Sequence, residues 1–140
     1  MRNHDELIEF NRLFAPRGGH GGFEPNTDVH LDEEGGAFVV HVELAGADPD
    51  SLRVYADDVD LSIAGERETR AVSRHASLLR KEIQSGAFVR RIRLPIPIDA
   101  DGAGAAYRDG ILTIRLPLAQ STKYPIVRTQ VRMTVRRTLA

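Results

Sequence analysis

The sequence predicts an all-β protein, an antiparallel β-sandwich. Short apolar runs with a period of two recur between residues 38 and 116, which is the pattern of strands that bury one face. Turn residues such as Glu34-Gly35-Gly36 separate these runs, and no long helical pattern lies between them. A series of short strands without intervening helices favours a sandwich of antiparallel sheets.

Five segments show this alternation most clearly. In the first of them, Phe38, Val40 and Val42 share one face, which we expect to lie in the core. In the Asp109-Gly110 turn, Gly110 is expected to supply the positive φ of a tight hairpin. The five segments are 38–44, 52–55, 59–63, 88–94 and 111–116.

The chain divides into three parts. Residues 1–22 are predicted to be a flexible N-terminal arm, in which a short amphipathic segment is followed by a glycine-rich hinge at 16–22. Residues 23–118 form the predicted domain. Residues 119–140 form a C-terminal extension, with five basic and no acidic residues from position 123 onward. The alternation of Val131, Met133 and Val135 fits either one more strand or an exposed extension.

Residues 66–85 interrupt the series of strands. This segment is polar and basic, and it is long for a connection inside a compact domain. Loops of this length are usually functional or disordered.

The charge is unevenly distributed along the chain. Residues 1–65 hold 14 acidic and 4 basic residues, and residues 66–140 hold 6 acidic and 15 basic residues. The net charge of −1 therefore hides two parts with charges of −10 and +9. Such a chain can pair its own strands electrostatically, or it can pair with a second copy.

The composition excludes several classes of protein. A chain of 140 residues with 41% hydrophobic residues fits one globular domain. Without cysteine there is no disulfide framework, thiolate nucleophile or Cys-ligated metal site. The sequence contains no run of about 18 apolar residues, so it predicts no membrane span. The first residues lack the basic start and apolar run of a secretion signal, so we expect a cytoplasmic protein.

Four motifs within residues 24–117 occur in the order in which one known family has them. The stretch from Glu24 to Leu44-Ala45-Gly46 is similar to the start of that family's domain, where Leu-Pro-Gly is usual. Residues 61–67 (LSIAGER) are similar to L-x-I-x-G-E-R/K, and residues 105–112 (AAYRDGIL) to A-x-Y-x-D/N-G-V-L. Residues 86–95 (GAFVRRIRLP) are similar to G-x-F-x-R-x-F-x-L-P, with Ile92 in place of the aromatic residue. The chain thus resembles the bacterial-type small heat shock proteins, the family of the α-crystallin domain.

The resemblance implies an immunoglobulin-like sandwich that forms a homodimer and often a larger oligomer. It implies an ATP-independent chaperone of the stress response, a holdase. Such a chaperone binds unfolding client proteins, suppresses their aggregation and passes them to refolding chaperones. In bacterial and plant members a long loop donates a strand to the partner subunit, and Leu78 to Glu82 of this chain lie where that strand is expected.

Three groups of site residues follow. Arg90 alternates in phase with Phe88 and Ile92, so its guanidinium is expected to point towards the apolar face, where a charge needs a partner. The resemblance implies that this arginine lies at the subunit interface. The alternative is that Arg90 lies on a solvated edge. The expected dimer interface is Leu78, Leu79, Arg80, Glu82 and Arg90. The expected client-binding surface is Leu7, Ile8, Phe10, Leu13 and Phe14, which either stay free or dock on their own sandwich.

The C-terminal extension departs from the family pattern. Family members commonly end in Ile-x-Ile/Val, a motif that inserts into a groove of a neighbouring dimer. Here Ile126 and Val127 are adjacent, whereas Val131 and Met133 have the alternate spacing that places two side chains in one groove. These four residues are the candidate C-terminal anchor, and their pattern predicts a dimer or a small oligomer.

Enzyme and ligand functions are not predicted. The five histidines show no metal-ligand spacing, and Gly102-Ala103-Gly104 is not followed by the helix of a dinucleotide-binding turn. The basic half lacks the clustered aromatic residues of a nucleic-acid surface. We therefore expect no enzyme activity, cofactor, metal, nucleic acid or membrane. The alternative function is an interaction module or co-chaperone adaptor that binds one folded partner.

Overall fold

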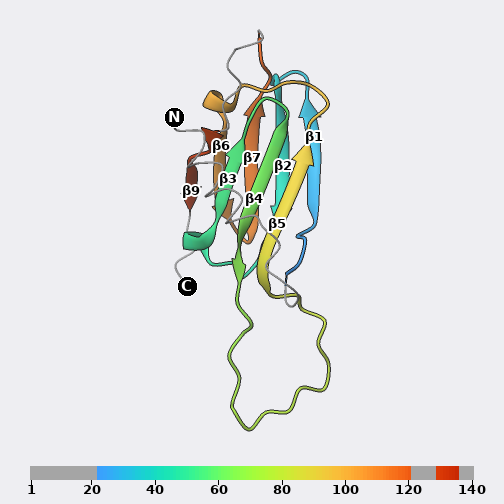
Figure 1. The fold of residues 1–140 in the computed structure, drawn as a ribbon, viewed down its shortest axis with the longest axis vertical. Coiled ribbons are helices and arrows are strands. Elements are labelled where there is room, and N and C mark those ends of the chain that lie inside the picture. Colours follow the sequence, from blue (N-terminus) through green and yellow to red (C-terminus); the bar gives the residue numbers. More distant parts are fainter. Residues whose placement is uncertain (1–21, 121–128, 136–140) are drawn as a thin grey trace, which may run out of the picture.

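The computed structural model describes residues 22–120 and 129–135, which fold into two β-sheets packed face to face (Figure 1). One sheet has five strands in the order β1-β2-β7-β6-β9, and the other has four in the order β5-β4-β3-β8. Neighbouring strands are antiparallel, except that β6 and β9 are parallel. The predicted antiparallel β-sandwich is confirmed.

The elements have the following bounds. The five-stranded sheet contains β1 (Thr27–Asp32), β2 (Ala37–Glu43), β7 (Ile111–Pro117), β6 (Gly104–Arg108) and β9 (Met133–Val135). The four-stranded sheet contains β5 (Gly86–Arg93), β4 (Asp60–Arg67), β3 (Arg53–Ala56) and β8 (Thr129–Gln130). Two single-turn 3-10 helices, η1 (Pro49–Ser51) and η2 (Ala100–Gly102), lie between strands.

The core lies between the two sheets and follows the predicted alternation. Phe38 and Val40 of β2 lie opposite Leu116 and Ile114 of β7, and all four side chains are buried. Burial of each such side chain contributes about 1.5–3 kcal/mol. The four-stranded sheet supplies the facing layer of the core with Val54, Leu61, Ile63 and Phe88, and Leu52 joins it from the residue before β3.

Strand β1 was not among the segments that alternation predicts. On the face that β2 turns to the core, this strand carries Thr27 and two apolar residues, Val29 and Leu31, which lie opposite Val40 and Phe38. Both side chains are still exposed, at 43% and 39%, because β1 is an edge strand. Two apolar residues within six are too few for a clear signal of a strand.

The predicted hairpin between β6 and β7 is present. Asp109 and Gly110 both have positive φ, 54° and 78°, which matches the turn type that favours Asp-Gly. A Cβ atom on Gly110 would lie 2.9 Å from the Cβ atom of Ala45. The position therefore needs glycine for its conformation and for the close approach of the next turn.

Tyr107 ties this hairpin to the end of β2. Its hydroxyl donates a hydrogen bond to the carbonyl oxygen of Leu44 inside the core. Burial raises the pKa of Tyr107 above its usual 10.0, and the backbone of Ala47 and the charge of Arg67 partly oppose this rise. The tyrosine thus stays neutral and acts as a hydrogen-bond donor.

Residues 129–135 form the additional strands that the alternation of Val131, Met133 and Val135 allowed. Strand β8 pairs with β3 in one sheet, and β9 pairs with β6 in the other. Between them, Val131 is 4% exposed and joins the core. This part of the predicted extension therefore packs on the sandwich of its own chain.

Replacing Gly65 by alanine tests how closely side chains pack on the core face of the four-stranded sheet. A Cβ atom there would lie 2.6 Å from Cζ of Phe88 and 2.9 Å from Cδ2 of Leu52, both buried. We expect Gly65→Ala to lower the free energy of unfolding by about 1–3 kcal/mol, measured by urea denaturation. Gly104→Ala is the control, because no atom lies within 4 Å of its Cβ position. Equal stability of the two variants would contradict the described packing.

Candidate functional site

The loop 68–85 projects from one end of the sandwich (Figure 1). It carries four large apolar side chains that are exposed, and Leu79 is 96% exposed. Burial of each of these side chains would contribute about 1.5–3 kcal/mol, which is not gained while they stay in water. The loop therefore presents apolar groups of the kind that bind another surface. The four residues are Val72, Leu78, Leu79 and Ile83.

The predicted exchange segment, residues 78–82, forms no strand within the chain. A strand needs neighbouring backbone groups as hydrogen-bond partners, and none of the described strands pairs with this segment. Arg80 and Glu82 form an ion pair with each other at 3.3 Å, with side chains 80% and 74% exposed. Such an exposed pair contributes little to stability, so both residues are available to a partner.

The base of the loop is ordered by polar contacts. Strand β4 continues to Arg67, so that the loop begins at residue 68, later than the predicted residue 66. The Nε and Nη2 atoms of Arg67 donate to the carbonyl oxygen of Gln84 at 2.9 and 2.7 Å. The hydroxyls of Thr69 and Ser85 lie 2.8 Å apart and form a hydrogen bond across the base.

Arg90 lies on β5, on the same face as buried Phe88, as its phase predicted. Its Nη1 atom is 3.2 Å from Oε2 of Glu24 in the same chain, and the side chain is 35% exposed. Its Nε atom is buried without a hydrogen-bond partner among the described residues. A buried donor of this kind is costly unless an acceptor reaches it.

Strand β1 provides an edge with the opposite charge to the loop. Besides half-exposed Val29 and Leu31, it carries Asp28 and Asp32. The loop carries four basic residues, Arg70, Arg74, Arg80 and Lys81, against Glu68 and Glu82. In the folded chain, part of the uneven charge of the sequence thus lies on an acidic edge strand and a basic loop.

The two halves of the predicted C-terminal anchor have different outcomes. Ile126 and Val127 lie outside the described residues. Val131 is buried, and its N–H donates to the carbonyl oxygen of Val54 on β3 at 2.9 Å. Met133 is half-buried, lies opposite Ala105 on β6 and packs against the core. In this single chain, Val131 and Met133 occupy the space between β3 and β6.

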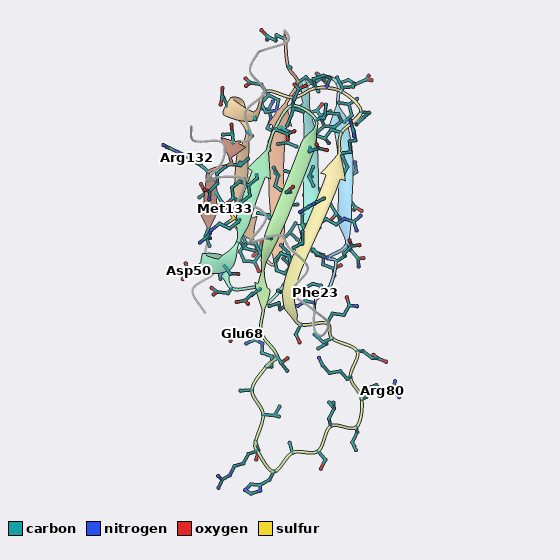
Figure 2. The ribbon with its side chains drawn as sticks, in the orientation of Figure 1. Phe23, Asp50, Glu68, Arg80, Arg132 and Met133 are labelled. Atoms are coloured by element: carbon teal, nitrogen blue, oxygen red, sulfur yellow. The ribbon has the colours of Figure 1, made fainter. Side chains whose placement is uncertain are left out.

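The five predicted client-binding residues, Leu7, Ile8, Phe10, Leu13 and Phe14, also lie outside the described residues. The chain that follows them enters the sandwich at Phe23, which Figure 2 shows beside the root of the loop. Phe23 is 8% exposed, and its ring centroid is 5.3 Å from that of Phe88. The guanidinium carbon of Arg67 lies 4.4 Å from the same ring centroid.

Four residues of these surfaces were not predicted from the sequence. Val29 and Leu31 have a short alternating signal that marks an edge strand only once β2 is placed beside them. Phe23 and Arg67 are far apart in the sequence, so no local pattern connects them. The aromatic residue that directly follows the glycine-rich hinge was the available signal for Phe23.

Some other types of site are absent from the described part of the chain. Residues 22–120 and 129–135 hold no group of three or more acidic or histidine side chains placed to bind a metal ion. No helix in these ranges has the length and apolar character that a membrane crossing requires.

Comparison with known proteins identifies relatives over most of the chain. The model of the Hsp20/alpha crystallin family matches residues 30–132. The alpha-crystallin of Mycobacterium tuberculosis is 34% identical over 118 residues, which are 80% of this chain and 79% of that protein. The 18 kDa heat shock protein of Streptomyces albus is 28% identical over 121 residues, 85% of each chain. The crystal structure of hspA from Xanthomonas axonopodis has a TM-score of 0.62 and 36% identity, covering 71% of this chain and 98% of that one.

Val131→Ala tests the packing of the C-terminal segment on its own chain. We expect the free energy of unfolding to fall by about 1–3 kcal/mol, because a buried side chain is truncated. Thr134→Ala is the control, because Thr134 is exposed on β9. The loss should not depend on protein concentration in urea denaturation. A loss that disappears on dilution would instead show that Val131 packs on another copy.

Proposed function

The chain belongs to the Hsp20/alpha crystallin family, whose members are chaperones, and we propose that it is an ATP-independent holdase. The match over residues 30–132 carries this proposal. In this function the protein binds exposed apolar segments of unfolding clients in the cytoplasm, suppresses their aggregation under stress and passes them to refolding chaperones.

The N-terminal arm is the proposed client-binding surface. Leu7, Ile8, Phe10, Leu13 and Phe14 are apolar, and the glycine-rich hinge at 16–22 lets them reach different clients. Phe23 directly follows the arm and is its attachment point, here called the root of the arm. The buried contact of Phe23 supports this proposal, because it fixes this root on the domain. An arm that docks on its own sandwich and releases on heating would gate client binding.

The loop and strand β1 are the proposed dimerisation elements. The segment 78–82 of one subunit would add a strand to the free edge of β1 in the other. Because side chains alternate along a strand, one of the adjacent leucines, Leu78 or Leu79, would meet Val29 and Leu31 on their shared face. Backbone hydrogen bonds, apolar burial and the opposite charges of loop and edge all favour this pairing.

Arg90 is proposed to join the same interface. Its buried Nε atom has no acceptor among the described residues, and a carboxylate from the second subunit would supply one. Glu82 is the candidate, because its own ion pair with Arg80 is solvent-exposed and weak.

The assembly is proposed to be a homodimer or a small oligomer. Val131 and Met133, which have the spacing of a tail anchor, pack on their own chain between β3 and β6. While these two side chains pack on their own chain, they are not available to link neighbouring dimers.

The holdase function is tested by light scattering of a heated model client with equimolar protein and no nucleotide. We expect aggregation to be suppressed, and deletion of residues 1–22 to weaken this suppression while the dimer persists. Unchanged activity of the deletion variant would place client binding on the sandwich or the extension. A dimer without any suppression would contradict the holdase and favour the adaptor that binds one folded partner.

Loop exchange is tested with the double variant Leu78→Ser/Leu79→Ser. The variant removes whichever leucine packs on Val29 and Leu31. Loss of one buried leucine, about 1.5–3 kcal/mol, should weaken the dimer at least about 10-fold, measured by mass photometry or sedimentation on dilution. Val72→Ser is the matched control, because Val72 is exposed in the same loop outside residues 78–82.

The same measurement tests the charges of the interface. Raising the salt from about 0.05 M to about 1 M should also loosen the dimer, because salt screens the attraction between the basic loop and the acidic edge. A wild-type dimer that ignores salt, or a double variant that dimerises like the Val72→Ser control, would overturn the proposed interface.

A further inference from the structure

We propose that Arg67 is a positioning residue that couples the root of the N-terminal arm to the base of the loop 68–85. Its side chain contacts both segments, the ring of Phe23 on one side and the carbonyl oxygen of Gln84 on the other. The coupling is a property of the domain itself. Its consequence for client binding rests on the proposed function.

The contacts of Arg67 use two different parts of the guanidinium. Along its edge, Nε and Nη2 donate to the carbonyl oxygen of Gln84, and Nη1 donates to the carbonyl oxygen of Ala45 at 3.3 Å. The face of the same group covers the ring of Phe23 at 4.4 Å. A planar guanidinium can make these edge and face contacts together, whereas the compact ammonium of lysine cannot.

Phe23 holds the opposite side of this contact. Its N–H donates to the carbonyl oxygen of Ala87 at 3.2 Å, and its ring packs against Phe88. The ring of Phe88 fits there because Gly65 has no side chain. The ring of Phe23 therefore lies between the core and the guanidinium and keeps water from one face of Arg67.

If the ring of Phe23 left the face of Arg67, the hydrogen bonds of Arg67 to the loop base would weaken. The exposed face of the guanidinium would become hydrated, and the side chain would lose the surface that orients its edge towards Gln84. The hydrogen bond between Thr69 and Ser85 would then hold the base without Arg67. Coupling of this kind is reciprocal, so ordering the loop should also hold Phe23 in place.

In the assembled protein, this coupling would link the two proposed surfaces. Pairing of the loop with a second subunit would order its base and favour the docked root of the arm. Conversely, a client that pulls the arm away would loosen the loop and weaken the dimer. Capture of a client and opening of the dimer would thus favour each other.

Hydrogen–deuterium exchange of the full chain, followed by mass spectrometry, tests the coupling without any client. The variants are Phe23→Leu, Arg67→Lys and the double variant. We expect each single variant to speed exchange of the loop-base amides at 83–86 by about fivefold, the effect of losing one contact of this strength. In the Arg67→Lys background, Phe23→Leu should add no further acceleration at the loop base.

Two controls keep the outcome specific. Phe23→Tyr keeps the ring under the guanidinium and should exchange like the wild type. Arg115→Lys makes the same substitution at an arginine whose Nη2 donates to Gly35 in the turn between β1 and β2, and it should leave the loop base unchanged.

Two results would overturn the proposal. In one, Phe23→Leu leaves exchange at 83–86 unchanged. In the other, it accelerates that exchange equally with and without Arg67, which would place the connection in Phe88 and β5. Since no client is present, a protein that fails to suppress aggregation can still show the coupling, and the two failures are distinguishable.

Discussion

The backbone groups along the edges of two open β-sheets need hydrogen-bond partners, and segments outside the core supply them at several of these edges. The C-terminal residues pair with β3 and β6, one edge of each underlying sheet. Phe23 forms a single bridge to β5. Within residues 22–120 and 129–135, no strand pairs with the outer edge of β1. That edge, with its exposed apolar and acidic side chains, is the one to which the proposed exchange segment would add a strand.

In the proposed dimer, the projecting loop is the counterpart of this open edge. A long segment with exposed leucines is unfavourable in an isolated chain, because its apolar groups and backbone stay in water. If a second subunit supplied the neighbouring strand, burial of these groups would stabilise the dimer. The rigid sandwich and the polar contacts at the loop base keep the segment pointing away from its own sheets. In the proposed dimer, this arrangement would leave the segment free to pair with another chain.

Much of this organisation was visible in the sequence because it depends on local patterns. The alternation around Phe38 and Val40 predicts a half-buried strand, and Asp109-Gly110 predicts its hairpin, because each depends on neighbouring residues. The four motifs identified the family, and the interruption after residue 66 marked the loop. Strand β1 gave a weaker signal, because its exposed position removes the selection for a continuous apolar face.

By itself, the sequence determined the sandwich, the turns that need glycine, the projecting segment and the family, since all of these appear as short-range patterns. Only the tertiary structure decided that Val131 packs beside Val54 and that one guanidinium contacts Gln84, Ala45 and Phe23. It also paired Arg90 with Glu24, 66 positions away, and left the buried Nε without an acceptor in the part of the chain that the structure describes. These contacts join residues far apart in the chain. Their geometry exists only after the two sheets have packed, so no local sequence pattern predicts them.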